Sequence, residues 1–151
     1  MKMLSHPVYI ANDANEKKRI RRILSEQGLT SYMNDTKWRE LCLGIAELPF
    51  PPSYQVKLVG QDLPSSELEY APPSGGDWGQ TPEGAVGFHI EWAKISPRMS
   101  LHRGMLVSPE IIDCSEELRA LMRRLRLPFV EDGDYFTLYG HGSGIDFDAL
   151  A

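Results

Sequence analysis

The chain has 151 residues, of which 42% are hydrophobic and 25% are charged, and its formal net charge is −5. These values fit one globular core and exclude an intrinsically disordered chain. No segment approaches the roughly 20 apolar residues of a membrane-spanning helix, and the first residues lack the apolar run of a signal peptide. We therefore expect a cytoplasmic protein without membrane contact, whose two cysteines are too few for the disulfide framework of a small secreted domain.

Charge is distributed unevenly along the chain. Residues 1–60 hold nine Lys or Arg and six Asp or Glu, a net of +3, whereas residues 61–151 hold seven and fifteen, a net of −8. Every Asp, Glu, Lys or Arg between residues 61 and 92 is acidic. Such a field attracts a basic protein partner and disfavours nucleic acid.

Two helices are expected in the first third of the chain. The first is capped at Asn12 or Asp13 and stopped by Gly28, and its apolar positions are Ile20, Ile23 and Leu24. Its opposite face is basic: Lys17, Lys18, Arg19, Arg21 and Arg22. The second helix starts at Asn34 or Asp35 and ends before three prolines. Its core stripe is Trp38, Leu41, Cys42 and Ile45.

Strands are expected next, on both sides of a long loop. Residues 54–58 alternate apolar and polar side chains, and so do residues 86–95, where Phe88, Ile90 and Trp92 are expected to face the core. Residues 61–84 between them are rich in Pro, Gly, Ser and acids. Loops of this length are uncommon in compact domains and are often functional.

In the last third of the chain, the sequence predicts a short extended piece at residues 105–107, a third helix capped by Ser115, and a hairpin around Asp132-Gly133. The apolar stripe of that helix is Leu118, Leu121, Met122 and Leu125. We read residues 1–151 as one α+β domain with an extended N-terminus (1–11) and a flexible acidic tail (141–151). The expected order is α-α-β-β-(β)-α-β-β, with an antiparallel sheet of four to five strands and three helices.

One cluster has the residue types of a chemical site. His89 and Glu91 fall two residues apart on one expected strand face, and with His102 or Asp77 they would make a metal site or an acid/base pair. Their spacing matches no known ligand pattern, and a surface salt bridge explains the same residues. We therefore expect no enzyme, no metal and no cofactor.

Two motifs carry a family resemblance. They are Asn-Asp-Thr-Lys-Trp-Arg-Glu-Leu at residues 34–41 and Glu-Leu-Pro-Phe-Pro-Pro at residues 47–52. With shorter pieces over roughly residues 28–140, they resemble a family of small bacterial proteins of unknown function. The chain is also similar in size, charge and organisation to immunity proteins, which implies a non-enzymatic protein that neutralises a toxin by direct binding.

The sequence thus favours a binding protein whose acidic loop meets a basic toxin surface. The contact residues expected in that loop are Asp77, Trp78, Glu83 and Glu69; Trp78 is either an interface anchor or a plug of the core. Two alternatives stay open: a small enzyme or metal-binding protein using His89, Glu91 and His102, or a regulatory module that binds nucleic acid through its basic first helix. The oligomeric state does not follow from the sequence.

Overall fold

The computed structural model of the chain describes residues 14–64, 86–102 and 104–147. Along these residues the elements are α2 (Ala14–Gln27), β1 (Thr30–Ser31), α3 (Asp35–Ile45), β2 (Ser53–Leu58), the 3-10 helix η2 (Val86–His89), β3 (Ile90–Ser96), β4 (Arg98–Leu101), β5 (Glu110–Asp113), α4 (Ser115–Arg124), β6 (Phe129–Asp132), β7 (Tyr135–Tyr139) and β8 (His141–Gly142). The expected α+β class is confirmed. None of the helices in these ranges is long and apolar enough to span a membrane.

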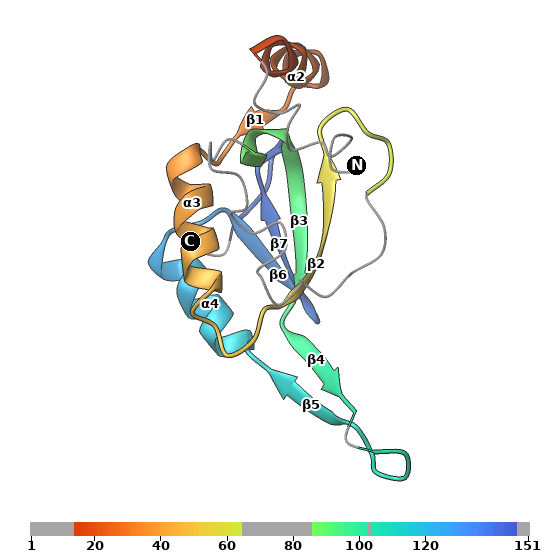
Figure 1. Cartoon of the computed structure of the whole chain (residues 1–151). Coiled ribbons are helices and arrows are strands. Elements are labelled where there is room, and N and C mark those ends of the chain that lie inside the picture. The colour runs from red at the N-terminus through yellow and green to blue at the C-terminus, as the bar shows by residue number, and fades with distance from the viewer. Residues whose placement is uncertain (1–13, 65–85, 103, 148–151) are drawn as a thin grey trace.

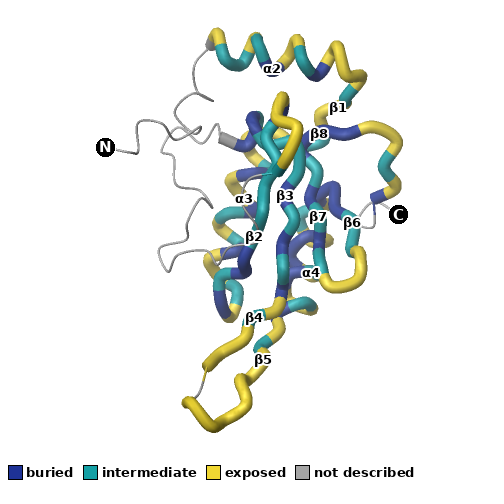
Figure 2. The backbone as a smooth tube through the Cα atoms, turned by 90° about the vertical axis from the view of Figure 1, so that its right-hand side faces the viewer, coloured by how far each residue is buried: buried dark blue, intermediate teal, exposed yellow. Residues whose placement is uncertain are grey.

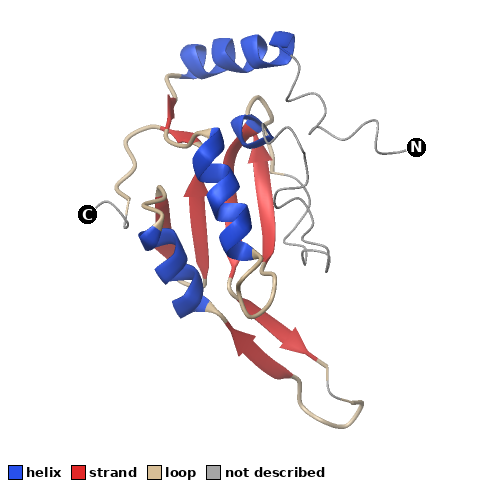
Figure 3. Ribbon diagram, turned by 60° about the vertical axis from the view of Figure 1, so that its left-hand side comes forward, coloured by secondary structure: helices blue, strands red, loops and turns tan. Residues whose placement is uncertain are grey.

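The centre of the molecule is a four-stranded antiparallel sheet in the order β2-β3-β7-β6 (Figure 1). Its register sets a row of apolar residues across the strands: Val56 faces Ala93, Ala93 faces Leu138, and Leu138 faces Phe129. Because directly opposite residues of antiparallel strands share one face, this row forms one apolar side of the sheet. Helices α3 and α4 pack against that side (Figure 3).

A continuous core joins the sheet to these two helices. Its buried side chains are Trp38, Leu41 and Ile45 from α3, Leu118, Leu121, Met122 and Leu127 from α4 and its exit, and Ile95, Phe129, Phe136 and Leu138 from the sheet. The apolar stripes expected in both helices are therefore on the core side. Leu125, expected in the same stripe, is half-buried because the helix has ended by that residue.

Helix α2 packs separately, across one end of the sheet (Figure 1). Ile20 and Leu24 bury themselves against Val59 in a second, smaller cluster. The helix ends as expected at Gly28, whose φ of +69° is the left-handed conformation that glycine adopts readily. Because this cluster is small, α2 is held by far less apolar contact than α3 or α4.

The caps of α3 and α4 differ in how well they match expectation. At α3, Asn34 accepts a hydrogen bond from the Lys37 amide at 2.8 Å, as an N-cap residue does. The expectation that Ser115 caps α4 is wrong, because Ser115 is already the first helical residue. The carboxylate of Asp113, at the end of β5, accepts from the Ser115 amide at 2.6 Å and also from its hydroxyl.

The strand expected over residues 86–95 begins late and turns its other face to the core. Residues 86–89 form η2, and within β3 the buried residues are Ala93 and Ile95. The three residues expected in the core, Phe88, Ile90 and Trp92, are half-buried. Tertiary packing overrides the alternation here, since Gly87 lies against the Trp38 ring where a side chain has no room.

The end of the described chain also differs from expectation. Residues 141–147 were expected in a flexible tail, but β8 pairs with β1 through Thr30–Gly142 and Ser31–His141. Phe147 is buried, and its ring packs edge-on against Tyr32 with the centroids 4.8 Å apart. This segment therefore folds back onto the body of the molecule.

The expected hairpin is present, formed by β6 and β7. Asp132 pairs with Tyr135, so the two turn residues are Gly133 and Asp134, one position later than expected. Gly133 has a φ of +60°, which the first position of a type I′ or II′ hairpin turn requires.

Candidate functional site

The four residues predicted to contact a partner, Asp77, Trp78, Glu83 and Glu69, lie outside the described residues. Candidate sites in the rest of the molecule therefore come from other side chains. Three groups stand out: the buried histidines near η2, a small cavity beside Trp38, and the hairpin formed by β4 and β5.

The three residues of the predicted chemical site do not come together. His89 is buried at the end of η2, whereas Glu91 accepts a 2.6 Å hydrogen bond from Lys57 on the neighbouring strand. His102 follows β4, which leads away from the body at the end opposite η2 (Figure 1). Among the described residues no group of three or more His, Cys, Asp or Glu could hold a metal ion.

His89 is nevertheless an unusual buried group. Within the described part of the chain its Nδ1 atom has no hydrogen-bond partner. Burial lowers the pKa of His89, and the nearby Glu16 carboxylate opposes this effect only in part. Burial therefore favours the neutral form of this imidazole.

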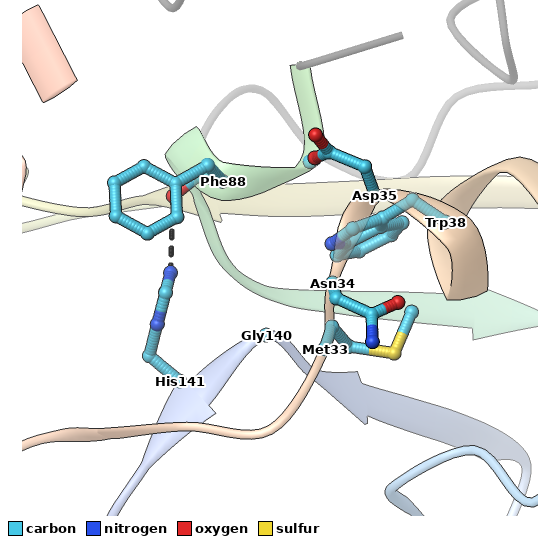
Figure 4. Close-up of a pocket in the computed structure, with 8 residues that line it drawn as sticks. Met33, Asn34, Asp35, Trp38, Phe88, Gly140 and His141 are labelled. Atoms are coloured by element: carbon cyan, nitrogen blue, oxygen red, sulfur yellow. Dashed lines mark hydrogen bonds between the residues drawn. The ribbon is translucent and has the colours of Figure 1, made fainter.

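His141 is buried and hydrogen-bonded through both ring nitrogens. Its Nε2 lies 3.0 Å from the Phe88 carbonyl (Figure 4), which can only accept, so Nε2 carries the proton. Nδ1 must then accept from the Ser31 hydroxyl at 2.8 Å. This is the hydrogen-bond order of a serine–histidine dyad. Burial lowers the pKa of His141, so its neutral form is favoured.

The cavity next to His141 is too small for Ser31 and His141 to act on a substrate. A cavity of about 20 Å³ is lined by Met33, Asn34, Asp35, Trp38, Gly87, Phe88, Gly140 and His141 (Figure 4). This volume has room for roughly one water molecule, not for a substrate. Ser31 and His141 are also paired through their backbones in β1 and β8. We therefore assign the pair a structural role: it ties β1, β8 and η2 together.

The two cysteines are poor nucleophiles. Burial raises the pKa of Cys42 and of Cys114 to about 11, so both thiols stay protonated at neutral pH. Cys42, expected in the core stripe of α3, is half-buried, whereas Cys114 is buried.

The basic face of α2 is partly engaged within the molecule. Arg19 forms an ion pair with Glu16, and the Arg21 guanidinium lies over the Phe88 ring, 5.6 Å from its centroid. Lys18, Arg21 and Arg22 are exposed. Three exposed cations on one helix provide less than the broad basic field that nucleic-acid binding uses.

The most prominent surface feature is the hairpin of β4 and β5. Residues 98–113, called the arm below, leave the body beyond the ends of β3 and α4 and extend away from it (Figures 1 and 3). The strands pair from Arg98–Asp113 at the base to Leu101–Glu110 near the tip. At the base, Arg98 forms ion pairs with Asp113 at 2.9 Å and with Asp134 at 3.4 Å. The base is therefore anchored by charge, and by the cap that Asp113 gives α4.

Much of the rest of the arm is exposed, as the tube coloured by burial shows (Figure 2), and its exposed side chains include several large aliphatic ones. Met105 and Leu106 are each 97% exposed at the tip, and Val107 and Ile111 are 54% and 61% exposed. Residues 105–107 were expected to form an extended piece, but they are the turn of this hairpin. Contiguous exposed aliphatic side chains of this kind mark an interaction surface.

The arm is also electrically balanced. Residues 98–113 contain two arginines, Arg98 and Arg103, and two acids, Glu110 and Asp113, so their formal charge sums to zero. The chain as a whole carries −5. The arm is therefore suited to an apolar, uncharged contact, in contrast to the electrostatic contact expected for the acidic loop.

Comparisons with known proteins define a family but no activity. A protein-family model matches residues 20–144, and its description is "Family of unknown function (DUF6678)". No curated protein and no solved structure matches the chain. The function must therefore be argued from the molecule's own surfaces.

Proposed function

Since the chain belongs to DUF6678, a family of unknown function, we propose its function from its own structure: it is a non-enzymatic protein that acts by binding another protein. The arm is the surface through which it binds. The observation that carries the proposal is the full exposure of Met105 and Leu106 at the tip of a hairpin that stands off the body.

The free energy of removing apolar side chains from water favours a partner that buries the tip of the arm. Moving one Leu or Met side chain out of water stabilises by about 1.5–3 kcal/mol. Met105 and Leu106 realise none of this in the isolated chain, because each is 97% exposed. A protein surface that closes over the tip would gain this free energy, less the entropy of association.

The candidate catalytic groups support a binding role in a different way. Among the described residues, His141 is committed to two structural hydrogen bonds, the thiols are protonated, and Glu91 is paired with Lys57. The cavity beside His141 has room for about one water molecule. The arm is the described feature whose exposure needs a partner to explain it.

The finer form of the proposal is an immunity-type inhibitor that neutralises a toxin by direct binding. It is supported by the acidic balance of residues 61–151, which would attract a basic toxin surface. Replacing Asp77, Glu83 and Glu69 together by Asn or Gln should slow association with the toxin and reduce its salt dependence. Stopped-flow kinetics at two ionic strengths measure this, and unchanged rates at both would refute the steering role.

In-cell photo-crosslinking tests the proposed binding surface without knowledge of the partner. A photo-crosslinking amino acid replaces Leu106 at the arm tip or, as a control, Leu63, which is 75% exposed outside the arm. Irradiation of cells of the native host should give a discrete protein adduct from position 106 and none from position 63. Absence of a protein adduct at position 106 would contradict the proposal.

A further inference from the structure

We infer that His141 works as a pH-sensitive clasp: when its imidazole takes up a proton at mildly acidic pH, residues 141–147 come away from β1 while the core stays folded. The clasp consists of the β1–β8 pair and the segment that follows it as far as Phe147. It lies at the end of the molecule opposite the arm (Figure 1), so its release is a property beyond the proposed function.

The clasp is held by few contacts. Strands β1 and β8 have two residues each and form a two-stranded sheet of their own in the described chain. Beyond β8, the buried Phe147 ring packs edge-on against Tyr32, and its centroid lies 6.1 Å from that of Tyr139. A two-stranded pair is marginal by itself, and regions with few buried contacts open locally before the core does. Opening the clasp therefore requires less free energy than unfolding the main sheet.

The neutral form of His141 holds the clasp closed. The residue is 2% exposed, and its ring accepts from the Ser31 hydroxyl of β1 and donates to the Phe88 carbonyl of η2 (Figure 4). Neither of these partners is charged. A second proton would turn Nδ1 from an acceptor into a donor, so the Ser31 hydroxyl would have to turn away. It would also place a full charge on a buried ring, which is costly without a bonded counter-ion.

The charged groups around the ring do not compensate for this burial. Burial lowers the pKa of His141, while the hydrogen bond to the Phe88 carbonyl and the Glu91 carboxylate of β3 raise it by less. Glu91 also accepts a hydrogen bond from Lys57 of β2 at 2.6 Å, which offsets its charge. Asp35, the first residue of α3, lines the same small cavity as His141 but is itself exposed to water (Figure 4). The closed clasp therefore favours the neutral ring.

The direction of the pH effect follows from proton linkage. In the open clasp the ring lies in water and takes up a proton near the ordinary pKa of about 6.5. The closed clasp takes up that proton only at lower pH, because burial lowers the pKa. Protons therefore favour the open form as the pH falls below about 6.5. For one proton, the ratio of open to closed clasp rises by at most about tenfold per pH unit.

Hydrogen exchange of individual amides at about pH 7.5 and about pH 5.5 tests the clasp. The reporters are the amides of residues 141–147 and the Tyr32 amide, which donates to the Gly140 carbonyl at 2.9 Å. After correction for the effect of pH on exchange itself, their protection should fall at the lower pH. Amides in β3 and β7 should stay more strongly protected at both pH values.

Three variants assign the pH effect to one ring. His141→Gln should remove the pH dependence of the reporter amides, while His89→Gln, at the other buried histidine, should keep it. Because Gln can also weaken the clasp at every pH, Ser31→Ala supplies a variant that retains the imidazole. It should lower the protection at both pH values and keep the pH dependence.

Four results would overturn the clasp. The first is wild-type protection of the reporter amides that is the same at both pH values. The second is a pH dependence that survives in His141→Gln, and the third is its loss in Ser31→Ala. The fourth is an equal loss of protection in β3 and β7, which would mean global unfolding. The arm takes no part in these measurements, so the proposed binding function stands or fails separately.

Discussion

The Ser31 hydroxyl and the Nδ1 atom of His141, from residues 110 apart in the sequence, lie 2.8 Å apart and join β1 to β8. Because Nε2 donates to the Phe88 carbonyl, Nδ1 can only accept. Ser31→Ala would leave a buried acceptor without its donor, which typically costs about 1–3 kcal/mol. Urea unfolding should show this loss, whereas Ser143→Ala, at an exposed serine, should change stability by less than about 0.5 kcal/mol.

The two buried histidines predict how stability depends on pH. Burial lowers the pKa of both His89 and His141 below the ordinary value of 6.5. The unfolded chain therefore binds more protons than the folded chain once the pH falls below about 6.5, so stability is complete above that pH and decreases below it. The groups facing these rings are Glu16 and Arg19 at His89, and Ser31, the Phe88 carbonyl and Glu91 at His141.

Denaturant titrations between neutral and mildly acidic pH measure this effect. His89→Gln and His141→Gln should each flatten the pH dependence, while Leu43→Ala, at an exposed residue that does not titrate, should leave it unchanged. A wild-type stability that is constant over this range would contradict the assignment of both histidines as neutral buried groups.

Leu121 lies where α4 meets α3, and its side chain fills the space beside Gly44. Leu121→Ala should destabilise the protein by about 2–5 kcal/mol, the usual range for a buried leucine. Thermal and urea unfolding should agree on the loss. The exposed Leu43→Ala on the outer side of α3 is the matched control. Equal effects of the two substitutions would mean that the helices pack with other faces.

The cap of α4 predicts that replacing Asp113 and replacing Ser115 destabilise the protein by different amounts. Asp113 accepts from the Ser115 amide and also pairs with Arg98 at the base of the arm. Asp113→Ala should cost about 0.5–2 kcal/mol, as loss of an N-cap does. Ser115→Ala should cost less, because the backbone amide that needs the cap remains paired. The reverse order in urea unfolding would contradict the assignment of Asp113 as the capping side chain.

The helices could be predicted from the sequence because their apolar residues recur at helical spacing between clear start and stop signals. Trp38, Leu41 and Ile45 are buried as that spacing requires. The face of β3 could not be predicted, because residues 86–89 continue the alternating pattern of the strand in the sequence but form η2, where Gly87 lies against Trp38. Likewise β1 and β8 have two residues each, too few for any periodicity, and are defined by pairing across the whole chain.

The arm shows a different limit of sequence reasoning. An apolar run such as residues 105–107 ordinarily predicts burial, and nothing in the run itself shows that it lies at the tip of a projecting hairpin. A usable signal was present: short apolar segments at 99–101 and 111–112 flank a loop containing Gly104 and Pro109, which is typical of a hairpin. Exposure, however, follows only from the position of the arm outside the core.

Hydroxyl-radical footprinting of the arm tip tests most directly the claim that this protein binds its partner through the arm. Met105 and Leu106 should be labelled rapidly in purified protein at low concentration, because both are 97% exposed. In cells of the native host both should be protected, while Leu43 and Leu63 stay reactive in both samples. Equal labelling of Met105 in the two samples would contradict the account.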